Sequence, residues 1–298
     1  MKYTVKKEDD GKKLKEILLS DIGLSASFLR HLKFTENGIK VNGAHATVRY
    51  VVHCGDILEL MTDDNRTGSG LEPTDIPLDI IYEDSELVVP SKPPYMPTHP
   101  SHNHHGDTLA DALAFRYKDQ PSGFVFRPIN RLDRNTSGLT IIAKNRISAA
   151  KLAESMRNGL IKKQYLAILD GVLPSSDGTI DTYLRRTSKS IIVREVCDKN
   201  GGGDRAITHY KTLRKTDKHT LVLASPETGR THQLRVHFAY LGCPIIGDDM
   251  YGNTSEFIGR HALHAVSLDF PHPTNGETVH LSSPIPEDIA RAITQLFD

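Results

Sequence analysis

One polar stretch constrains the fold of this chain more than any other feature of its sequence. Residues 62–77, TDDNRTGSGLEPTDIP, contain two glycines and two prolines and show no apolar periodicity, which is typical of a linker between domains. A chain of 298 residues suits either one large domain or a small module plus a larger domain. The linker favours the second arrangement, with a module over residues 1–61 and a domain over residues 78–298.

The small module has the pattern of two short helices followed by short strands. Apolar residues recur twice at the spacing of an amphipathic helix. The segment GIKVNGAHATVRYVVHCGDILELM then alternates as strands do, with Asn-Gly and Cys-Gly turns. The inward-facing positions are Leu14, Ile17 and Leu18 in the first helix, which stops at Gly23, and Phe28, Leu29 and Leu32 in the second, which Ser25 caps.

Basic side chains of these two helices are candidates for an RNA-binding face. Lys12 and Lys13 fall on the first predicted helix, and Arg30 and Lys33 fall on the second. Charge alone favours the alternative that these residues keep the helices soluble. RNA binding and solubility are therefore both open from charge alone, and the order of the elements helps to choose between them.

Overall charge and cysteine spacing narrow the class of protein. Lys plus Arg equals Asp plus Glu, at 37 each, so the formal net charge is zero. Many nucleic-acid-binding proteins are basic, so any such surface here must come from local clustering. No apolar run approaches the roughly 20 residues of a membrane span, and no signal-peptide core is present. The spacing of Cys54, Cys197 and Cys243 argues against a disulfide framework and a cysteine zinc site. We expect a cytoplasmic protein.

The larger domain is rich in strands, with helices interspersed. Many predicted strands follow one another without a helix between them. This favours an α+β fold with a mixed, largely antiparallel central sheet and flanking helices. The glycine run DKNGGGDR is interpreted as a hairpin turn, because no Lys-Ser or Lys-Thr follows to form a phosphate loop. The predicted strands are DIIYE, ELVVPSKP, GLTIIAKN, KKQYLAILDG, SIIVREV, AITHYKTLRK and HTLVLASPE, and the predicted helices are GDTLADALAFRYK, from near Thr108, and RISAAKLAESMRNG.

A single carboxylate lies between two arginines at the mouth of a predicted buried strand. In RPINRLDRNTSGLTIIAK, Asp133 is flanked by Arg131 and Arg134. Burial raises the pKa of a carboxyl group, whereas nearby guanidinium groups lower it. Several arginines would keep this carboxylate ionised at neutral pH, available as a nucleophile or a base. The alternative is an ion pair that fixes a loop.

A later helix could bring a second charged group to the same place. Residues 231–241 have an apolar stripe at Leu234, Phe238 and Leu241. Arg235 lies about 100° round from Leu234, on the same side as His232. An arginine in this position can point into a cleft beside the core. For this helix alone, an arginine on the surface is the favoured alternative.

Several blocks of the larger domain, in order, resemble the RluA-type pseudouridine synthases. The blocks are NRLDRNTSGL, KKQYLAILDG, TGRTHQLRVHFAYLGCPIIGDDMYG and RHALHAVSLDFPHP, with further similarity in GDRAITHYKTL and VVPSKPPYMPTHP. The resemblance covers about residues 78–285. Members of this family isomerise uridine to pseudouridine in ribosomal or transfer RNA, so the resemblance implies an RNA-modifying enzyme with a flipped target base.

The resemblance also implies roles for particular residues. The nucleophilic aspartate of the family falls on Asp133, its active-site tyrosine on Tyr165, and the basic residue that pairs with the aspartate on Arg235. Whether the aspartate attacks the sugar or the base stays open. Candidates for RNA phosphate contacts, or for filling the space of the flipped base, are Arg131, Arg134, Arg230 and His232. The chain departs from the common pattern at Asn130, Asn135 and Ser91, where the family often has histidine, aspartate and asparagine.

The small module resembles the S-four-type RNA-binding domain over residues 4–61. Two helices, then IKVNG, then GDILEL are the recurring elements, although SASFLRHL lacks the basic residue that usually stands beside the serine. Many RluA-type enzymes carry such a domain, which supports RNA binding by the module. Together the resemblances imply large-subunit ribosomal RNA as the favoured partner, transfer RNA as an alternative, no DNA and no cofactor. We expect a monomer.

Three alternatives compete with this interpretation. One is a metal site in the histidine-rich THPSHNHHGD, but no cysteine or carboxylate at ligand spacing accompanies His99, His102, His104 and His105, so no metal is expected. A second is a non-catalytic RNA-binding or ribosome-assembly protein, which predicts the loss of a catalytic residue. The third is a hydrolase that releases uracil, which needs a second acid.

Overall fold

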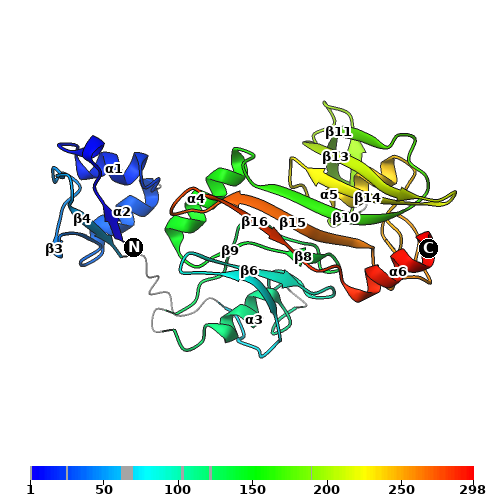
Figure 1. Ribbon diagram of the computed structural model, residues 1–298, viewed down its shortest axis with the longest axis horizontal. Coiled ribbons are helices and arrows are strands. Elements are labelled where there is room, and N and C mark those ends of the chain that lie inside the picture. Colours follow the sequence, from blue (N-terminus) through cyan, green and yellow to red (C-terminus); the bar gives the residue numbers. More distant parts are fainter. Residues whose placement is uncertain (1, 25, 62–69, 102–103, 121–122, 189) are drawn as a thin grey trace.

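The computed structural model describes residues 2–24, 26–61, 70–101, 104–120, 123–188 and 190–298. The predicted cap at Ser25, the histidine at His102 and the first half of the predicted linker lie outside the described residues. Figure 1 shows residues 2–24 and 26–61 as a separate lobe at one end of the molecule, beside a long body built on one large sheet. No described helix is long and apolar enough to span a membrane.

The small lobe consists of a short sheet and two helices. Its strands run in the order β1-β4-β2-β3, and all their pairings are antiparallel. Asn42 and Gly43 both have positive φ, at 51° and 81°, which is the conformation of the predicted Asn-Gly hairpin turn. The elements are β1 (Lys2–Thr4), a 3-10 helix (Lys7–Asp9), α1 (Leu14–Ser20), α2 (Ala26–Phe34), β2 (Ile39–Val41), β3 (Ala44–His45) and β4 (Ile57–Leu60).

The lobe has its own core, which extends onto one helix of the body. All the predicted inward-facing residues of α1 and α2 are buried in this core. Ile147 from α4 of the body belongs to the same cluster, and the guanidinium of Arg146 lies 5.5 Å from the centre of the Phe28 ring. The lobe and α4 therefore share packed side chains.

The predicted positions of two lysines on the first helix are wrong. Helix α1 begins at Leu14, so Lys12 and Lys13 precede it. The backbone of Lys13 instead bridges to Val51, and the Lys12 ammonium lies 2.6 Å from a carboxylate oxygen of Asp9. These contacts tie the start of the helix to the neighbouring segments.

Among the described residues of the body, twelve strands form one sheet. Its main order is β12-β11-β13-β14-β10-β15-β8-β6-β9-β7, with β16 on β15 and β5 on β6. Every pairing is antiparallel except β8 with β15, so the predicted α+β fold with a largely antiparallel sheet is confirmed. The strands are β5 (Asp79–Glu83), β6 (Leu87–Lys92), β7 (Arg127–Pro128), β8 (Ser137–Leu139), β9 (Ile142–Ala143), β10 (Lys162–Asp170), β11 (Asp177–Arg186), β12 (Arg194–Cys197), β13 (Asp204–Lys215), β14 (His219–Pro226), β15 (Leu263–Pro271) and β16 (Thr278–Ser282).

The helices of the body that the structure describes flank this sheet (Figure 1): α3 (Leu109–Arg116), α4 (Arg146–Arg157), α5 (Gln233–Tyr240) and α6 (Glu287–Phe297). The predicted start of α3 is confirmed, because Thr108 and Asp111 form a capping box there. Asn145 caps α4 by accepting hydrogen bonds from two backbone N–H groups. Helix α5 is shorter than the predicted 231–241, since His232 precedes it in the left-handed conformation.

The predicted strand GLTIIAKN is broken into β8 and β9. At the break, the backbone N–H of Thr140 donates to the carbonyl of Pro90 in β6 at 3.2 Å, and Pro90 has no N–H to donate in return. On the other side of the chain, the Asn130 side chain pairs with the backbone. Its Oδ1 accepts from the backbone N–H of Ile141 at 2.8 Å, and its Nδ2 donates to the carbonyl of Leu139 at 3.2 Å. A buried amide with both groups paired makes an interruption of the ladder stable.

The glycine run DKNGGGDR is not a hairpin turn. It carries the chain from β12 to β13, which pair with opposite sides of β11. The crossing is tight, because a Cβ on Gly203 would lie 2.6 Å from the Cys197 sulfur and 2.9 Å from the Leu184 carbonyl oxygen. The predicted strand SIIVREV is correspondingly shortened to β12.

Candidate active site

The loop that carries Asp133 joins β7 to β8 and is held by two buried basic side chains. The Lys92 ammonium donates to the carbonyl of Arg134 at 3.1 Å, and the Arg260 guanidinium donates to the carbonyl of Asn135 at 2.9 Å. Both cationic side chains are almost fully buried. They fix the backbone on the C-terminal side of Asp133, while the Asp133 side chain keeps 28% of its surface exposed.

Two threonines hold the rest of the loop. The Thr98 hydroxyl donates to the carbonyl of Leu132 at 2.9 Å and is 3.3 Å from its backbone nitrogen. The Thr136 hydroxyl lies 2.8 Å from Nε2 of His261. The loop thus has fixed contacts on both sides of the aspartate, which is the pre-organisation that a reactive group needs.

Gly138 lets the end of this loop join the middle of the sheet. Its φ is +113°, and a Cβ there would overlap the backbone of Ala265 in β15. This is the position at which β8 pairs in parallel with β15. A glycine is required, because a side chain at this site would push the loop away from the sheet.

Arg235 is the charged group that α5 brings to Asp133. Its Nη1 lies 3.5 Å from Asp133 Oδ2. Its stronger partner is Asp248, which accepts hydrogen bonds from Nε and Nη2, each at 2.7 Å. The Arg235 side chain is only 6% exposed and that of Asp248 is fully buried. This bidentate pair fixes the guanidinium and leaves Nη1 to face Asp133.

His232 and Tyr251 complete the surroundings of the guanidinium. His232 Nδ1 lies 2.8 Å from the Tyr251 hydroxyl, and its Nε2 lies 3.9 Å from Asp133 Oδ2. Burial lowers the pKa of His232 by more than the charge of Asp133 raises it, so this imidazole is neutral at neutral pH. The Arg235 guanidinium lies 5.1 Å from the centre of the Tyr251 ring.

Tyr165 reaches the same place from β10. Its side chain is buried, and its residue position pairs with Ala265 of β15 beside a β-bulge. Burial raises the pKa of its phenol above the ordinary value, and the charge of Asp133 raises it further. The phenol is therefore protonated at neutral pH and can donate a hydrogen bond.

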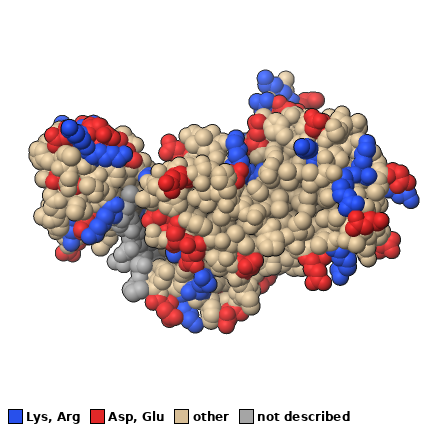
Figure 2. All heavy atoms as spheres, viewed as in Figure 1, with Lys and Arg blue, Asp and Glu red and all other residues tan. Residues whose placement is uncertain are grey.

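These side chains line one cavity of about 970 Å³, which is large enough for a ligand of nucleotide size. Asp133, Tyr165 and Arg235 all contribute to its wall, although far apart in the sequence. Cationic side chains outnumber acidic ones: Arg131, Arg134, Arg157, Lys163, Arg186, Arg230 and Arg235 against Asp133 and Glu227. A chain with zero net charge needs a local cluster of positive charge to bind an anionic ligand. The cavity wall is such a cluster. On the face in Figure 2, by contrast, the two signs are interspersed.

The predicted RNA-contacting residues divide into two groups. Arg131, Arg134, Arg230 and His232 line the cavity. Arg134 and Arg230 also bond to the backbone carbonyls of Tyr95 and Arg205. The residues predicted on the small lobe, Lys12, Lys13, Arg30 and Lys33, are not among the described residues that line it.

The histidine-rich segment beside the cavity contains a carboxylate contact that the sequence reasoning missed. His104 Nδ1 lies 2.6 Å from Asp107 Oδ2. His99 instead packs edge-on against Phe126, with ring centres 4.7 Å apart. No group of three metal-binding side chains is found among the residues that the structure describes.

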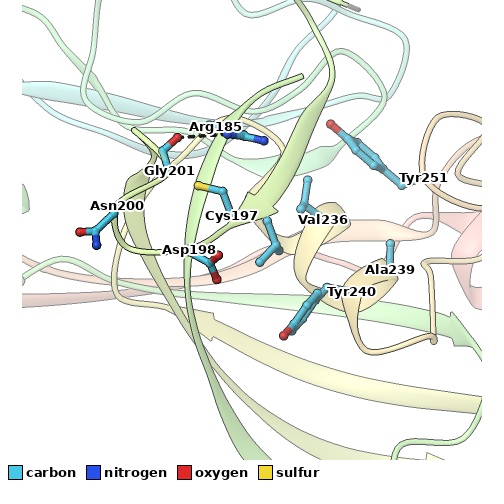
Figure 3. Close-up of a pocket in the computed structure, with 10 residues that line it drawn as sticks. Arg185, Cys197, Asp198, Asn200, Gly201, Val236, Ala239, Tyr240 and Tyr251 are labelled. Atoms are coloured by element: carbon cyan, nitrogen blue, oxygen red, sulfur yellow. Dashed lines mark hydrogen bonds between the residues drawn. The ribbon is translucent and has the colours of Figure 1, made fainter. Parts of the chain in front are cut away.

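A second cavity, of about 780 Å³, lies between β12 and α5 (Figure 3). Val236, Ala239 and Tyr240 of α5 line it together with Tyr251. Because Tyr251 also contacts both His232 and Arg235, its ring supports the active-site side of α5 from behind.

Sequence reasoning missed Lys92, Asp248 and Arg260. Each has a visible signal: Lys92 interrupts an apolar strand, Asp248 lies in the quoted block GDDMYG, and Arg260 opens the block RHALHAVSLDFPHP. Ion pairs of this kind depend on contacts between distant segments, such as Arg260 with Asp288 of α6 at 2.7 Å. Spacing along the chain does not reveal them.

Comparison with known proteins gives a consistent result. Residues 86–240 match the family described as RNA pseudouridylate synthase. An uncharacterized RNA pseudouridine synthase of Bacillus subtilis, YjbO, is 37% identical over 273 residues, covering 92% of this chain and 95% of the relative. Ribosomal large subunit pseudouridine synthase D of Xanthomonas campestris is 36% identical over 238 residues, covering 75% and 71%. The solved structure of human RNA Pseudouridylate Synthase Domain Containing 4 has a TM-score of 0.61 and 25% identity, covering 73% of this chain and 92% of that one. The chain therefore belongs to the RNA pseudouridylate synthase family, within its RluA-type group, and is an RNA pseudouridine synthase.

Proposed function

We propose that this enzyme converts specific uridines of large-subunit ribosomal RNA to pseudouridine, with Asp133 as the nucleophile, Tyr165 as a proton-handling and stacking group, and Arg235 as the partner of the aspartate. The enzyme acts as a cytoplasmic monomer without a cofactor. The choice of RNA rests on the names of relatives such as ribosomal large subunit pseudouridine synthase D, one of which, from Zymomonas mobilis, is 37% identical over 235 residues. Transfer RNA is the alternative substrate.

The arrangement of acids supports isomerisation rather than hydrolysis. Moving uracil from a nitrogen link to a carbon link requires the base to be detached, rotated, rejoined through its carbon 5 and deprotonated there. One nucleophilic carboxylate suffices for this sequence, whereas a glycosidase uses two carboxyl groups and a water. Besides Asp133, the described wall of the cavity contains one acid, Glu227. Glu227 is 55% exposed and bonded to His209 at 2.7 Å.

The surroundings of Asp133 support its assignment as nucleophile. The carboxylate faces Arg235 at 3.5 Å and a neutral His232 at 3.9 Å, so one fixed positive charge lies beside it. Tyr165 keeps its proton at neutral pH and lies in the same cavity. It can stack on the base and help to transfer the final proton, directly or through a water.

The cations of the cavity support binding to a folded RNA. Extruding a base from a helix costs a few kcal/mol, which contacts to the backbone must offset. Arg131, Arg134 and Arg230 are exposed cations on the cavity wall. We assign them to phosphate contacts or to the space that the flipped base leaves.

We assign RNA binding to residues 1–61 as well, as an S-four-type domain that a linker over residues 62–77 joins to a catalytic domain over residues 78–298. Arg30 and Lys33 are exposed on α2, and Phe34 next to them has 85% of its surface exposed. An exposed aromatic ring beside cations can stack on an unpaired base. Lys12 is already paired with Asp9, so it contributes less to this surface.

Asp133→Asn tests the nucleophile, with Glu227→Gln as the matched control in the same cavity. The variants are incubated with ribosomal RNA, and pseudouridine is detected by carbodiimide labelling. Asp133→Asn loses conversion while its RNA affinity stays within about twofold, and Glu227→Gln keeps conversion. Conversion by Asp133→Asn would refute the mechanism. Free uracil released by the unmodified enzyme, and lost in Glu227→Gln, would support a hydrolase.

Mapping of pseudouridine in cells with and without the gene tests the choice of RNA. Positions that disappear from large-subunit ribosomal RNA support the proposal, and positions that disappear only from transfer RNA support the alternative. No difference in either RNA, together with no conversion in vitro, would favour the non-catalytic RNA-binding protein.

A further inference from the structure

Lys163 is a buried cation on the cavity wall that the proposed mechanism does not use. The residue lies on β10 with only 7% of its surface exposed, and it lines the same cavity as Tyr165 two residues later. Side chains two apart on a strand share one face. Lys162, on the opposite face, is exposed.

Lys163 differs from the other buried basic residues of this region because it has no partner of its own in the part of the chain that the structure describes. Lys92 donates to three carbonyl oxygens, and Arg235 and Arg260 each hold a carboxylate with two hydrogen bonds. Among the described residues, the Lys163 ammonium makes no hydrogen bond and no ion pair. Burying a charge without a partner is costly, and burial accordingly lowers the pKa of Lys163.

The ammonium lies beside the segment Thr228-Gly229-Arg230, which lines the same cavity. Its Nζ lies 3.7 Å from the position that a Cβ on Gly229 would occupy. A glycine at this position therefore leaves the tip of the lysine uncovered. The exposed cations Arg157, Arg186 and Arg230 line the same cavity.

We infer that Lys163 binds a phosphate group of the substrate RNA, one that adjoins the target uridine. This inference rests on the proposed function. A phosphodiester supplies the negative charge that the fold does not, and the ammonium can approach it as a point charge. Along β10, Lys163 and Tyr165 are about 7 Å apart, a separation that one nucleotide can span. A base beside Tyr165 and Asp133 can thus place a backbone phosphate at Lys163.

A carboxylate ligand or a structural role fits the observations less well. The cavity wall is rich in other cations, which suits a ligand with several negative charges rather than one. A structural lysine would have acceptors in the fold, as Lys92 has. The positive site is therefore assigned to the RNA backbone and not to the core.

Lys163→Met tests this inference, with Lys162→Met as the matched control on the exposed face of the same strand. Both substitutions are made in the Asp133→Asn protein, so that the RNA is bound without being converted. Affinity for ribosomal RNA is measured over a range of KCl concentrations, and stability is measured by urea unfolding. Methionine keeps the length of the side chain and removes its charge.

We expect Lys163→Met to weaken RNA binding roughly tenfold at low salt, and to make the slope of log affinity against log salt shallower by about 0.7. The urea midpoint stays equal or rises, because an unpaired buried charge has been removed. In Lys162→Met the affinity, slope and midpoint change little. An unchanged affinity and slope in Lys163→Met would overturn the inference, as would a lowered midpoint in both Lys163→Met and Lys163→Gln.

This measurement is independent of the proposed chemistry, because it reports binding. If the unmodified enzyme converts no ribosomal uridine but Lys163→Met still reduces the salt dependence, the proposed function fails and the phosphate site stands. If the unmodified enzyme converts ribosomal uridine and Lys163→Met does not change the salt dependence, the proposed function stands and the phosphate site fails.

Discussion

Replacing Asp248 with asparagine should destabilise the protein and misplace Arg235. The Asp248 carboxylate is fully buried and accepts two hydrogen bonds from Arg235, each at 2.7 Å. It also accepts from the backbone N–H groups of Met250 and Tyr251, at 3.1 and 3.2 Å. Asparagine keeps the volume but replaces one acceptor with an NH₂ group that faces a guanidinium donor. The Arg235 charge is then buried without its main partner.

The expected size follows from the burial of this pair. Removing one partner of a buried ion pair costs about 3–5 kcal/mol. For a domain of roughly 150–250 residues, each kcal/mol lowers the melting temperature by about 2–4 °C, so we expect a loss of roughly 6–20 °C. A catalytic group displaced by about 1 Å can lose a hundredfold in rate. We therefore expect kcat to fall by about that factor, while KM changes little.

A double-mutant cycle separates the structural and catalytic contributions. Unfolding in urea and single-turnover formation of pseudouridine are measured for Asp248→Asn, Asp248→Leu, Arg235→Met and the Arg235→Met/Asp248→Leu protein. Two apolar residues of similar size leave no buried charge, so the double replacement should cost far less stability than the sum of Asp248→Leu and Arg235→Met. Its activity should stay low, because Asp133 has lost the guanidinium. Additive losses of stability, or an Asp248→Asn protein within about 1 kcal/mol of the unmodified enzyme, would refute this reasoning.

Two further predictions concern stability. Burial lowers the pKa of His237 from 6.5 to about 4, so below pH 6.5 the unfolded chain binds a proton that the folded protein does not. The free energy of unfolding therefore decreases as the pH falls from 6.5 to 4.5, and His237 accounts for about 2 kcal/mol of this decrease. Equal decreases in His237→Gln and the unmodified protein, measured by urea unfolding, would contradict the assignment. Gly138→Ala should lower the free energy of unfolding by at least about 3 kcal/mol, because the φ of Gly138 is positive and a Cβ there would overlap Ala265. Gly202→Ala, at a φ of +74° in open space, should lower it by about 1 kcal/mol. Equal losses would show that the close approach of Gly138 to Ala265 does not contribute to stability.

Local pattern predicted the elements whose residues interact mainly with near neighbours. The start of α3 at its capping box and the extent of β10 agree with the apolar periodicity and the capping residue. The interruption between β8 and β9 did not follow from local pattern, because it involves contacts with Asn130 and Pro90 from other segments. The crossing of DKNGGGDR over β11 likewise depends on strand order, which forms between segments distant in sequence.

In the candidate site, too, some residues were predicted from the sequence and others were not. Resemblance to a family assigned Asp133, Tyr165 and Arg235, and the fold brings all three to one cavity. The groups that hold them there were not predicted. Lys92 and Asp248 act through contacts to Arg134 and Arg235 across 42 and 13 residues of sequence, and such contacts have no fixed spacing that a single sequence could reveal.

Buried cations around the cavity suggest how a chain with zero net charge can bind RNA. Arg235 and Arg260 each hold a carboxylate, and Lys92 donates to carbonyl oxygens, so these three side chains fix the catalytic loop and α5. Lys163 has no such task within the described residues, and exposed arginines line the same cavity. Because field strength at a cleft depends on nearby charges more than on the total, acidic residues elsewhere on the surface can balance the net charge without weakening the site. Adding acidic residues far from the cavity should therefore change RNA affinity much less than neutralising Lys163 alone.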